Sequence, residues 1–255
     1  MKAMILAAGL GMRMRPLTDD RPKALVEISG HTLLEITLTR LRAYGIREVI
    51  INVHHFADMI LEYLKAHDNF AMRIEVSREE TLLDTGGGLK KAAYFFLEDA
   101  GRGGAPFILH NVDVISTIDL RRMVQFHTEN QALATLAVQS RETSRYLYFD
   151  EQLQLCGRQA GRDQDPEWVR SSKPAQALAF SGIQVISPRL LTMMREEGVF
   201  SIITAYLHLA AQGGKILAFR ADEYYWRDLG RPESLAQAAQ DLKRNRLLEF
   251  GVSLI

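Results

Sequence analysis

The beginning of the chain constrains the fold more than any other stretch. Lys2 to Ala8 is a short apolar run that ends at Gly9, which is typical of a buried strand entering a sharp turn. Gly9 and Gly11 allow the backbone to approach a ligand and to aim its N–H groups inward, as a phosphate-binding loop must. Arg13 and Lys23 follow and add fixed positive charge for a polyphosphate. This stretch predicts an anion-binding loop of the kind that holds nucleotides.

Other readings of the same residues remain open or are excluded. A glycine pair after a strand is often only a turn. The stretch is not a dinucleotide-binding fingerprint, because Met14 stands where that motif needs its third glycine, and no Gly-Lys-Ser/Thr follows Gly9 as a Walker A loop requires. A signal peptide is also excluded, since the apolar run is short and lacks a cleavage site of small residues.

Composition limits the function classes that this chain can serve. Its 31 basic and 31 acidic residues balance, which argues against binding to nucleic acid or to a membrane surface. An apolar content of 47% argues against disorder, and no apolar run reaches the length of a membrane span. The lone Cys156 has no partner for a disulfide. We therefore expect a soluble, cytoplasmic protein with a single domain over residues 1–255, of unknown oligomeric state.

Alternating strands and helices predict a parallel sheet. Leu34, Leu38 and Leu41 share one helical face ahead of Gly45, and Glu48 to Val53 reads as a second buried strand. A second helix and a third strand follow, marked by Phe56, Ile60 and Leu64 and then by Met72 to Val76. Strand, helix, strand, helix in this order predicts a parallel sheet with helices on its faces.

Two later segments are candidates for ligand contact. Asp84 to Gly88 contains three successive glycines and precedes a predicted helix over Leu89 to Leu97. It is either a plain loop or a place where backbone lies against a flat ligand such as a base. Asp113 follows the predicted strand Pro106 to His110, at the end of a parallel strand where open α/β sheets bind ligands. For an isolated aspartate, a helix cap or a turn is the simpler interpretation.

Residues 141–177 change in character and hold several glycines, prolines and polar clusters. We predict a hairpin of Tyr146 to Phe149 against Leu153 to Cys156, within an insert that lies over one edge of the site. Adjacent His54 and His55 would point to opposite faces of a strand, so we expect them to shape the pocket or core rather than share a metal.

Five motifs follow one another along the chain. They are Gly9-x-Gly11-x-Arg13-Met14-x-Pro16-x-Thr18 with Pro22-Lys23, Asp84-Thr85-Gly86-Gly87-Gly88, Asn111-x-Asp113, Phe180-Ser181-Gly182-Ile183 and Trp226-x-Asp228-x-Gly230. Each motif is weak by itself, but the ordered set is specific. It resembles the signature of the sugar-1-phosphate nucleotidyltransferases, and within that family the short bacterial type exemplified by N-acetylmuramate-1-phosphate uridylyltransferase.

The resemblance implies a Rossmann-like three-layer α/β/α fold with a mostly parallel central sheet and a small β excursion. It also implies a reaction in which a sugar 1-phosphate attacks the α-phosphorus of a nucleoside triphosphate, with UTP favoured, and releases pyrophosphate. The attacking phosphate oxygen is already ionised near neutral pH. The work of such an enzyme is therefore to position two polyanions and to neutralise their charge.

The resemblance also implies roles for single residues. Asp113 and Asp228 would hold Mg²⁺. The catalytic residues would be Arg13, Lys23 and Asp113. Of these, Arg13 would bind the departing pyrophosphate, and Lys23 would bridge the α-phosphate and the sugar phosphate. The remaining roles fall to backbone and neighbouring groups: triphosphate contacts from Gly11 and Met12, base contacts from Ala8, Gly9 and Gly87, and sugar contacts from Asn111 and Gly182.

One position departs from the pattern, because Val112 stands where the family commonly has glycine. If that position required a positive φ, a β-branched valine would be strained. Two alternatives stay open beside uridylyl transfer. One keeps the fold and changes the substrate, with guanylyl or cytidylyl transfer to a mannose- or heptose-type phosphate. The other, prompted by Val112, is a catalytically silent regulatory protein that binds nucleotide-sugars.

Overall fold

The computed structural model describes residues 1–98, 104–171 and 174–243. By its internal contacts the chain divides into two compact units. The first unit comprises Met1–Leu82, His110–Thr117 and the chain from Tyr225 onward, and the second comprises Leu83–Leu109 and Ile118–Tyr224. The chain passes from the second unit back to the first within β6 (Phe107–Asn111).

The first unit is built on three parallel strands, β1 (Lys2–Leu6), β4 (Glu48–Val53) and β5 (Arg73–Arg78). β4 lies between the other two, with Ile50 of β4 opposite Met4 of β1 and Glu75 of β5. The apolar run of β4 is buried from Val49 to Val53, as expected for a parallel strand covered on both faces. This confirms the predicted parallel arrangement, and it brings the carboxyl ends of the three strands to one edge.

Helix α1 (Leu33–Ala43) follows the pattern read from the sequence. Its N-terminus is capped by Thr32, whose Oγ1 accepts the Glu35 N–H at 3.0 Å. Leu34, Leu38 and Leu41 are fully buried on one face, which confirms the predicted stripe. Gly45, with φ +81°, lies just beyond the helix in the left-handed conformation that commonly ends one.

The remaining elements of the first unit are shorter or lie later in the chain. β7 and β14 pair antiparallel, as do β2 and β3. The bounds are η1 (Met12–Met14), η2 (Lys23–Leu25), β2 (Glu27–Ile28), β3 (His31–Thr32), α2 (Ala57–Ala66), η3 (Asp68–Ala71), β7 (Val114–Ser116), β14 (Trp226–Asp228) and α8 (Pro232–Lys243).

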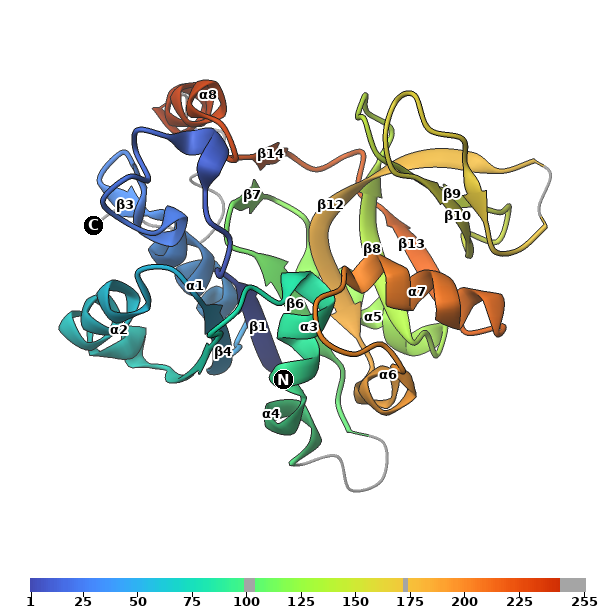
Figure 1. Cartoon of the computed structure of the whole chain (residues 1–255), viewed down its shortest axis with the longest axis horizontal. Coiled ribbons are helices and arrows are strands. Elements are labelled where there is room, and N and C mark those ends of the chain that lie inside the picture. Colours follow the sequence, from blue (N-terminus) through green and yellow to red (C-terminus); the bar gives the residue numbers. More distant parts are fainter. Residues whose placement is uncertain (99–103, 172–173, 244–255) are drawn as a thin grey trace. The chain divides into compact units, whose positions relative to one another are not determined.

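The second unit holds a mixed sheet around β8 (Ala134–Gln139), which pairs parallel with β13 (Ile216–Arg220) and antiparallel with β12 (Gln176–Ile186). β12 is long, and it continues into a small excursion where it pairs with β9 (Tyr146–Phe149) (Figure 1). β9 forms the predicted hairpin with β10 (Leu155–Gln159), but this second strand begins two residues later than predicted and extends to Gln159. Leu153, with φ +58°, belongs to the turn, and β11 (Glu167–Trp168) adds at the edge.

One predicted helix of the second unit was wrong in its bounds. The expected helix over Leu89 to Leu97 is two helices, α3 (Asp84–Lys91) and α4 (Ala93–Leu97), and α3 includes the glycine run. The glycines tolerate helical geometry here because the amides of Gly86 and Gly87 donate to the Phe200 carbonyl at 2.9 and 3.2 Å. The other helices of this unit are α5 (Leu120–Glu129), α6 (Pro188–Met193) and α7 (Ile202–Ala211).

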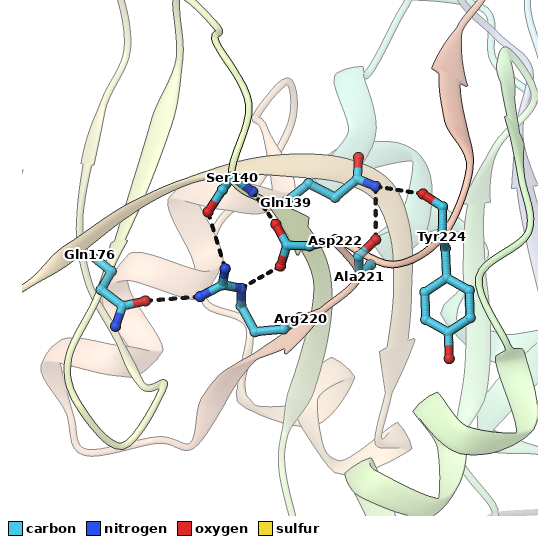
Figure 2. Close-up of polar contacts among 7 residues, drawn as sticks. All are labelled: Gln139, Ser140, Gln176, Arg220, Ala221, Asp222 and Tyr224. Carbon is cyan, nitrogen blue, oxygen red and sulfur yellow. Dashed lines mark hydrogen bonds and ion pairs between the residues drawn. The ribbon is translucent and has the colours of Figure 1, made fainter.

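A polar network fixes the chain as it leaves β13 (Figure 2). Arg220 donates to Asp222 at 2.7 Å, to Ser140 at 3.1 Å and to Gln176 of β12 at 3.1 Å. Gln139 of β8 donates to the carbonyls of Ala221 and Tyr224 at 2.8 and 3.0 Å. These bonds tie the end of β13 to its neighbour β8 and to β12 on the far side of β8.

Taken together, the parallel strands, their helices and the β excursion make a Rossmann-like α/β fold. Within the described residues, no helix combines the length and the apolar character needed to cross a membrane.

Candidate active site

The loop after β1 is held by the carbonyl of Gly11. This oxygen accepts the Met14 N–H at 2.8 Å and the Thr18 hydroxyl at 2.9 Å. Gly11 has φ +66° and begins η1, so its backbone conformation calls for glycine. Gly9, by contrast, is exposed, and a Cβ built on it would meet no atom within 4 Å. The backbone at Gly9 is therefore open to a ligand.

A buried pair of polar side chains anchors the start of this loop. Asn52, at the end of β4, accepts the Ala7 N–H at 2.8 Å and donates to Glu79 at 2.8 Å. Glu79 is 4% exposed, and its backbone carbonyl lies 2.8 Å from His54 Nδ1. Hydrogen bonds thus join the carboxyl ends of β1, β4 and β5. His54 adds a further bond to Glu79 there, which agrees with the expectation that it shapes the core or the pocket.

Lys23 and Asp113 form an ion pair at this edge, between Lys23 Nζ and Asp113 Oδ2. Their side chains are only 10% and 21% exposed, so water screens the pair weakly. η2 places Lys23, and the turn between β6 and β7 places Asp113, although 90 residues separate them in the sequence. The structure therefore brings together a cation and a carboxylate that the sequence singled out separately.

Asp228 reaches the same place along the ribbon of β7 and β14. In this ribbon Asp228 lies opposite Val114, and the Leu229 N–H donates to the Asp113 carbonyl at 2.8 Å. The Asp228 carboxylate is oriented by the Gly230 N–H, which donates to Oδ1 at 2.5 Å. Both predicted metal ligands accordingly lie at the same end of one two-stranded ribbon.

Gly230 marks the point where the charged groups converge. A Cβ built on it would lie 2.7 Å from Arg13 Nη2, 2.7 Å from Asp228 Oδ1 and 3.3 Å from Lys23 Nζ. Since Lys23 is bonded to Asp113, four side chains from four segments of the first unit gather here: Arg13, Lys23, Asp113 and Asp228.

Val112 fits its position without backbone strain. It lies outside the positive-φ region, is 5% exposed, and donates its N–H to the Leu6 carbonyl at 3.1 Å. The backbone carbonyl oxygen of the neighbouring Asn111 accepts a hydrogen bond from His110 Nδ1 at 2.8 Å. Burial and the nearby charge of Arg40 lower the pKa of His110 to about 3, so this histidine is neutral at physiological pH.

The donor set suits magnesium bound together with a substrate. Among the residues that the structure describes, no group of three or more His, Cys, Asp or Glu side chains could hold a metal by itself. Mg²⁺ is a hard cation that prefers oxygen ligands, and proteins commonly bind it through one or two carboxylates together with substrate phosphates. Asp113 and Asp228 match that pattern.

Two predicted ligand-contacting glycines belong to the second unit. Gly87 lies in α3, and a Cβ built on it would be 2.3 Å from the Gly198 carbonyl oxygen. Gly182 has φ +73° and lies where the pairing of β12 with β8 shifts register, between Phe180 and Gln184. Packing explains why position 87 is glycine, and backbone conformation explains why position 182 is glycine, without any ligand. The proposed contacts of Gly87 and Gly182 with a ligand therefore stay predictions.

The sequence interpretation missed Asn52, Glu79 and the packing role of Gly230. A polar asparagine inside the apolar run Glu48–Val53 was the available signal for the first of these. The other two become visible only through contacts distant in sequence.

Comparison with known proteins decides the family. A family model described as nucleotidyl transferase matches residues 2–154, which include the loop after β1, Lys23 and Asp113. The chain belongs to the nucleotidyl transferase family. Asp228 and Gly230 lie beyond the matched residues.

Relatives of this family resemble the chain over most of its length. It is 32% identical over 241 residues to an N-acetylmuramate alpha-1-phosphate uridylyltransferase of Caulobacter vibrioides, covering 91% of this chain and 93% of that protein. It is 30% identical over 91% of its length to a mannose-1-phosphate guanyltransferase beta-B of Xenopus laevis, and there the match spans 62% of that protein.

A solved structure of a putative glucose-1-phosphate thymidylyltransferase from Bacillus anthracis shares the fold. It superposes with a TM-score of 0.76 at 18% identity, covering 96% of this chain and 95% of that one. The relatives found by sequence thus include proteins named for uridylyl and for guanylyl transfer.

Proposed function

We propose that this chain transfers a uridylyl group from UTP to a sugar 1-phosphate such as N-acetylmuramate 1-phosphate and releases pyrophosphate. The observation that carries the proposal is the cluster of Arg13, Lys23, Asp113 and Asp228 at the edge of the first unit. The choice of UTP and of this sugar is supported by the uridylyltransferase relative, which matches the chain almost end to end.

The reaction needs positioning more than proton transfer. An ionised oxygen of the sugar phosphate attacks the α-phosphorus, a new P–O bond forms, and the bond to the β-phosphate oxygen breaks with its electron pair leaving on pyrophosphate. Lys23, held at the centre of the cluster, would neutralise charge on the α-phosphate and the sugar phosphate. Arg13, exposed on the loop, would bind the departing pyrophosphate.

Asp113 and Asp228 would hold Mg²⁺, which neutralises phosphate charge when bound. Because Asp113 Oδ2 is bonded to Lys23, this carboxylate also keeps the lysine ammonium beside the metal position. The backbone at Ala8 and Gly9 is suited to the base, and the open space at Gly9 supports that assignment. Gly11 and Met12 would donate amides to the triphosphate.

The sugar would be read by Asn111, by Gly182 and by the insert of residues 141–177, with Gly87 contributing to the base. Residues 172 and 173 of this insert lie outside the described part of the chain. The single cysteine, Cys156, is buried and unpaired, which suits a reducing compartment such as the cytoplasm.

Substitution of the two central charges tests the proposal. We expect Asp113→Asn and Lys23→Ala each to lower pyrophosphate release from UTP and N-acetylmuramate 1-phosphate by at least about 10²-fold, because each removes a preorganised charge from the reacting phosphates. Arg21→Ala is the matched control, since Arg21 is exposed and pairs with its neighbour Asp20. Near-normal release by either variant, with Arg21→Ala also normal, would contradict the assigned roles.

A second candidate is guanylyl transfer to a mannose-type phosphate, favoured by the guanyltransferase relative. A panel of UTP, GTP, CTP and dTTP with several sugar 1-phosphates, followed by pyrophosphate release, separates the candidates. Binding of a nucleotide-sugar without turnover of any pair would instead identify a silent binding protein. The unstrained fit of Val112 removes the main structural argument for that outcome.

A further inference from the structure

Gly230 is a glycine for a reason other than its own backbone. Its φ lies outside the left-handed region, so an alanine could adopt the same conformation. The residue is buried, and the space in front of its Cα is filled. Gly11 offers the contrast, since its φ of +66° would strain any side chain irrespective of the room available.

Charged groups of the cluster fill the space at Gly230. Arg13 Nη2 and Asp228 Oδ1 would each lie 2.7 Å from a Cβ, and Lys23 Nζ would lie 3.3 Å from it. The first two distances are below any real Cβ contact, and the third is tight. The same residue also donates its N–H to Asp228 Oδ1 at 2.5 Å.

We propose that Gly230 is a positioning residue of the phosphate site. By lacking a side chain it allows the guanidinium of Arg13 and the ammonium of Lys23 to gather around one point beside Asp228, so that both cations can bind one phosphate chain. Its amide orients the Asp228 carboxylate at this point. The inference rests on the proposed function, to which it adds a residue that acts through Arg13, Lys23 and Asp228 and touches no substrate itself.

A methyl group at this position should therefore harm binding more than folding. The atoms that it would meet are the ends of side chains, and the end of a long arginine moves at little cost to the fold. Arg13 is exposed, so its guanidinium has solvent to move into. Once displaced, it no longer lies beside Lys23, and the phosphate chain loses one of its two cations.

The test uses inorganic tripolyphosphate with magnesium chloride, titrated into the full-length protein by calorimetry. This probe carries the phosphate chain without a base, so its result does not depend on which nucleotide the enzyme uses. We expect Gly230→Ala to bind at least about tenfold more weakly than the wild type, the effect of losing one charge-assisted contact. Its thermal unfolding midpoint should change by only a few degrees, because the atoms that the methyl group meets are the ends of side chains.

A double-substitution cycle separates positioning from a general structural effect. In an Arg13→Ala background one of the two groups that would lie 2.7 Å from the added methyl is gone, so we expect Gly230→Ala to weaken binding by clearly less than it does in the wild type. The matched control is an Arg15→Ala background, because Arg15 lies in the same loop but is exposed and pairs with Asp19 at 3.2 Å. There the full penalty of Gly230→Ala should persist.

The inference is overturned if Gly230→Ala binds tripolyphosphate as tightly as the wild type, or if the wild type does not bind it. It is also overturned if the penalty is the same in both arginine backgrounds, or if Gly230→Ala unfolds below the temperature of the titration. Turnover of UTP by the wild-type protein tests the proposed function separately. If the wild type turns over UTP and Gly230→Ala does so at the same rate, this inference fails while the proposed function stands.

Discussion

The two glycine-rich segments of this chain look alike in sequence and differ in three dimensions. At Gly9, in the loop after β1, a side chain would meet no atom within 4 Å. At Gly87, in α3, a Cβ would lie 2.3 Å from the Gly198 carbonyl oxygen, and at Gly86 a Cβ would lie 2.3 Å from the ring of Phe200. The first segment is open, and the second is filled by the protein.

This difference separates two reasons for a glycine. In the loop after β1, backbone is left accessible near the strand ends where Arg13, Lys23, Asp113 and Asp228 gather. In α3, the glycines allow residues 198–200 to pack directly on the helix, where Phe200 accepts the amides of Gly86 and Gly87. A glycine run therefore indicates close approach of something to the backbone, and only the structure shows whether that is a ligand or another part of the chain.

The largest change in stability is expected in α3, where the protein itself fills the space at the glycines. Gly87→Ala should lower the free energy of unfolding by about 3 kcal/mol, because the methyl group meets the backbone of Gly198, which cannot rotate away as a side chain can. Chemical denaturation measures the change. Gly161→Ala is the control: it adds the same methyl group in the same unit, but its nearest contact would be an ordinary 3.4 Å from Gln164, and we expect a change within about 0.5 kcal/mol.

Equal stability of Gly87→Ala and Gly161→Ala would break the comparison between the two segments. It would mean that residues 198–200 yield easily, and a ligand would then be the better explanation for the glycine at position 87.

The dense packing of the second unit can also be tested by pH, without altering a glycine. His127 of α5 is 3% exposed, with Nδ1 3.0 Å from Thr135 Oγ1. Burial, with a smaller contribution from Arg189, lowers its pKa from 6.5 to about 4. The folded protein therefore keeps this histidine neutral at pH values where the unfolded chain binds a proton, and its contribution to stability is lost as the pH falls from about 6.5 towards 4.

From about pH 6 to pH 5 this one group should cost about 1 kcal/mol of unfolding free energy. His127→Gln keeps a polar partner for Thr135 but does not titrate. Between pH 6 and pH 5 the unfolding free energy of this variant should therefore fall by about 1 kcal/mol less than that of the wild type. Urea denaturation at a series of pH values measures the difference. Parallel pH curves for the two proteins would show that position 127 is open to water in the folded state.

Much of the fold could be predicted from the sequence because it depends on local patterns. The apolar run of β4 and the stripe of Leu34, Leu38 and Leu41 report burial directly, and both were confirmed. The helix containing Gly86 to Gly88 could not be predicted, because glycine disfavours helices and the compensating bonds come from Phe200, more than a hundred residues away.

The site shows the same division. Arg13, Lys23, Asp113 and Asp228 were chosen from motifs, and the structure brings them together around Gly230. Their roles on phosphate and metal stay predictions. The crowding at Gly230 could not be predicted, since it depends on Arg13 and Lys23, which lie more than two hundred residues away in the sequence and meet Gly230 only after folding.

The smallest expected change in stability, and the most informative, lies in the open segment. Gly9 has neither a positive φ nor a neighbour within 4 Å, so Gly9→Ala should leave the unfolding free energy unchanged or raise it by up to about 1 kcal/mol through a less flexible unfolded chain. Affinity for UTP should nevertheless fall by at least about tenfold, because the methyl group takes room at the position that we propose for the base. Denaturation and calorimetric titration of the same preparation give both numbers. A variant that is stable and binds UTP normally would show that the open backbone at Gly9 does not face the nucleotide, and the two glycine segments would then no longer differ in function.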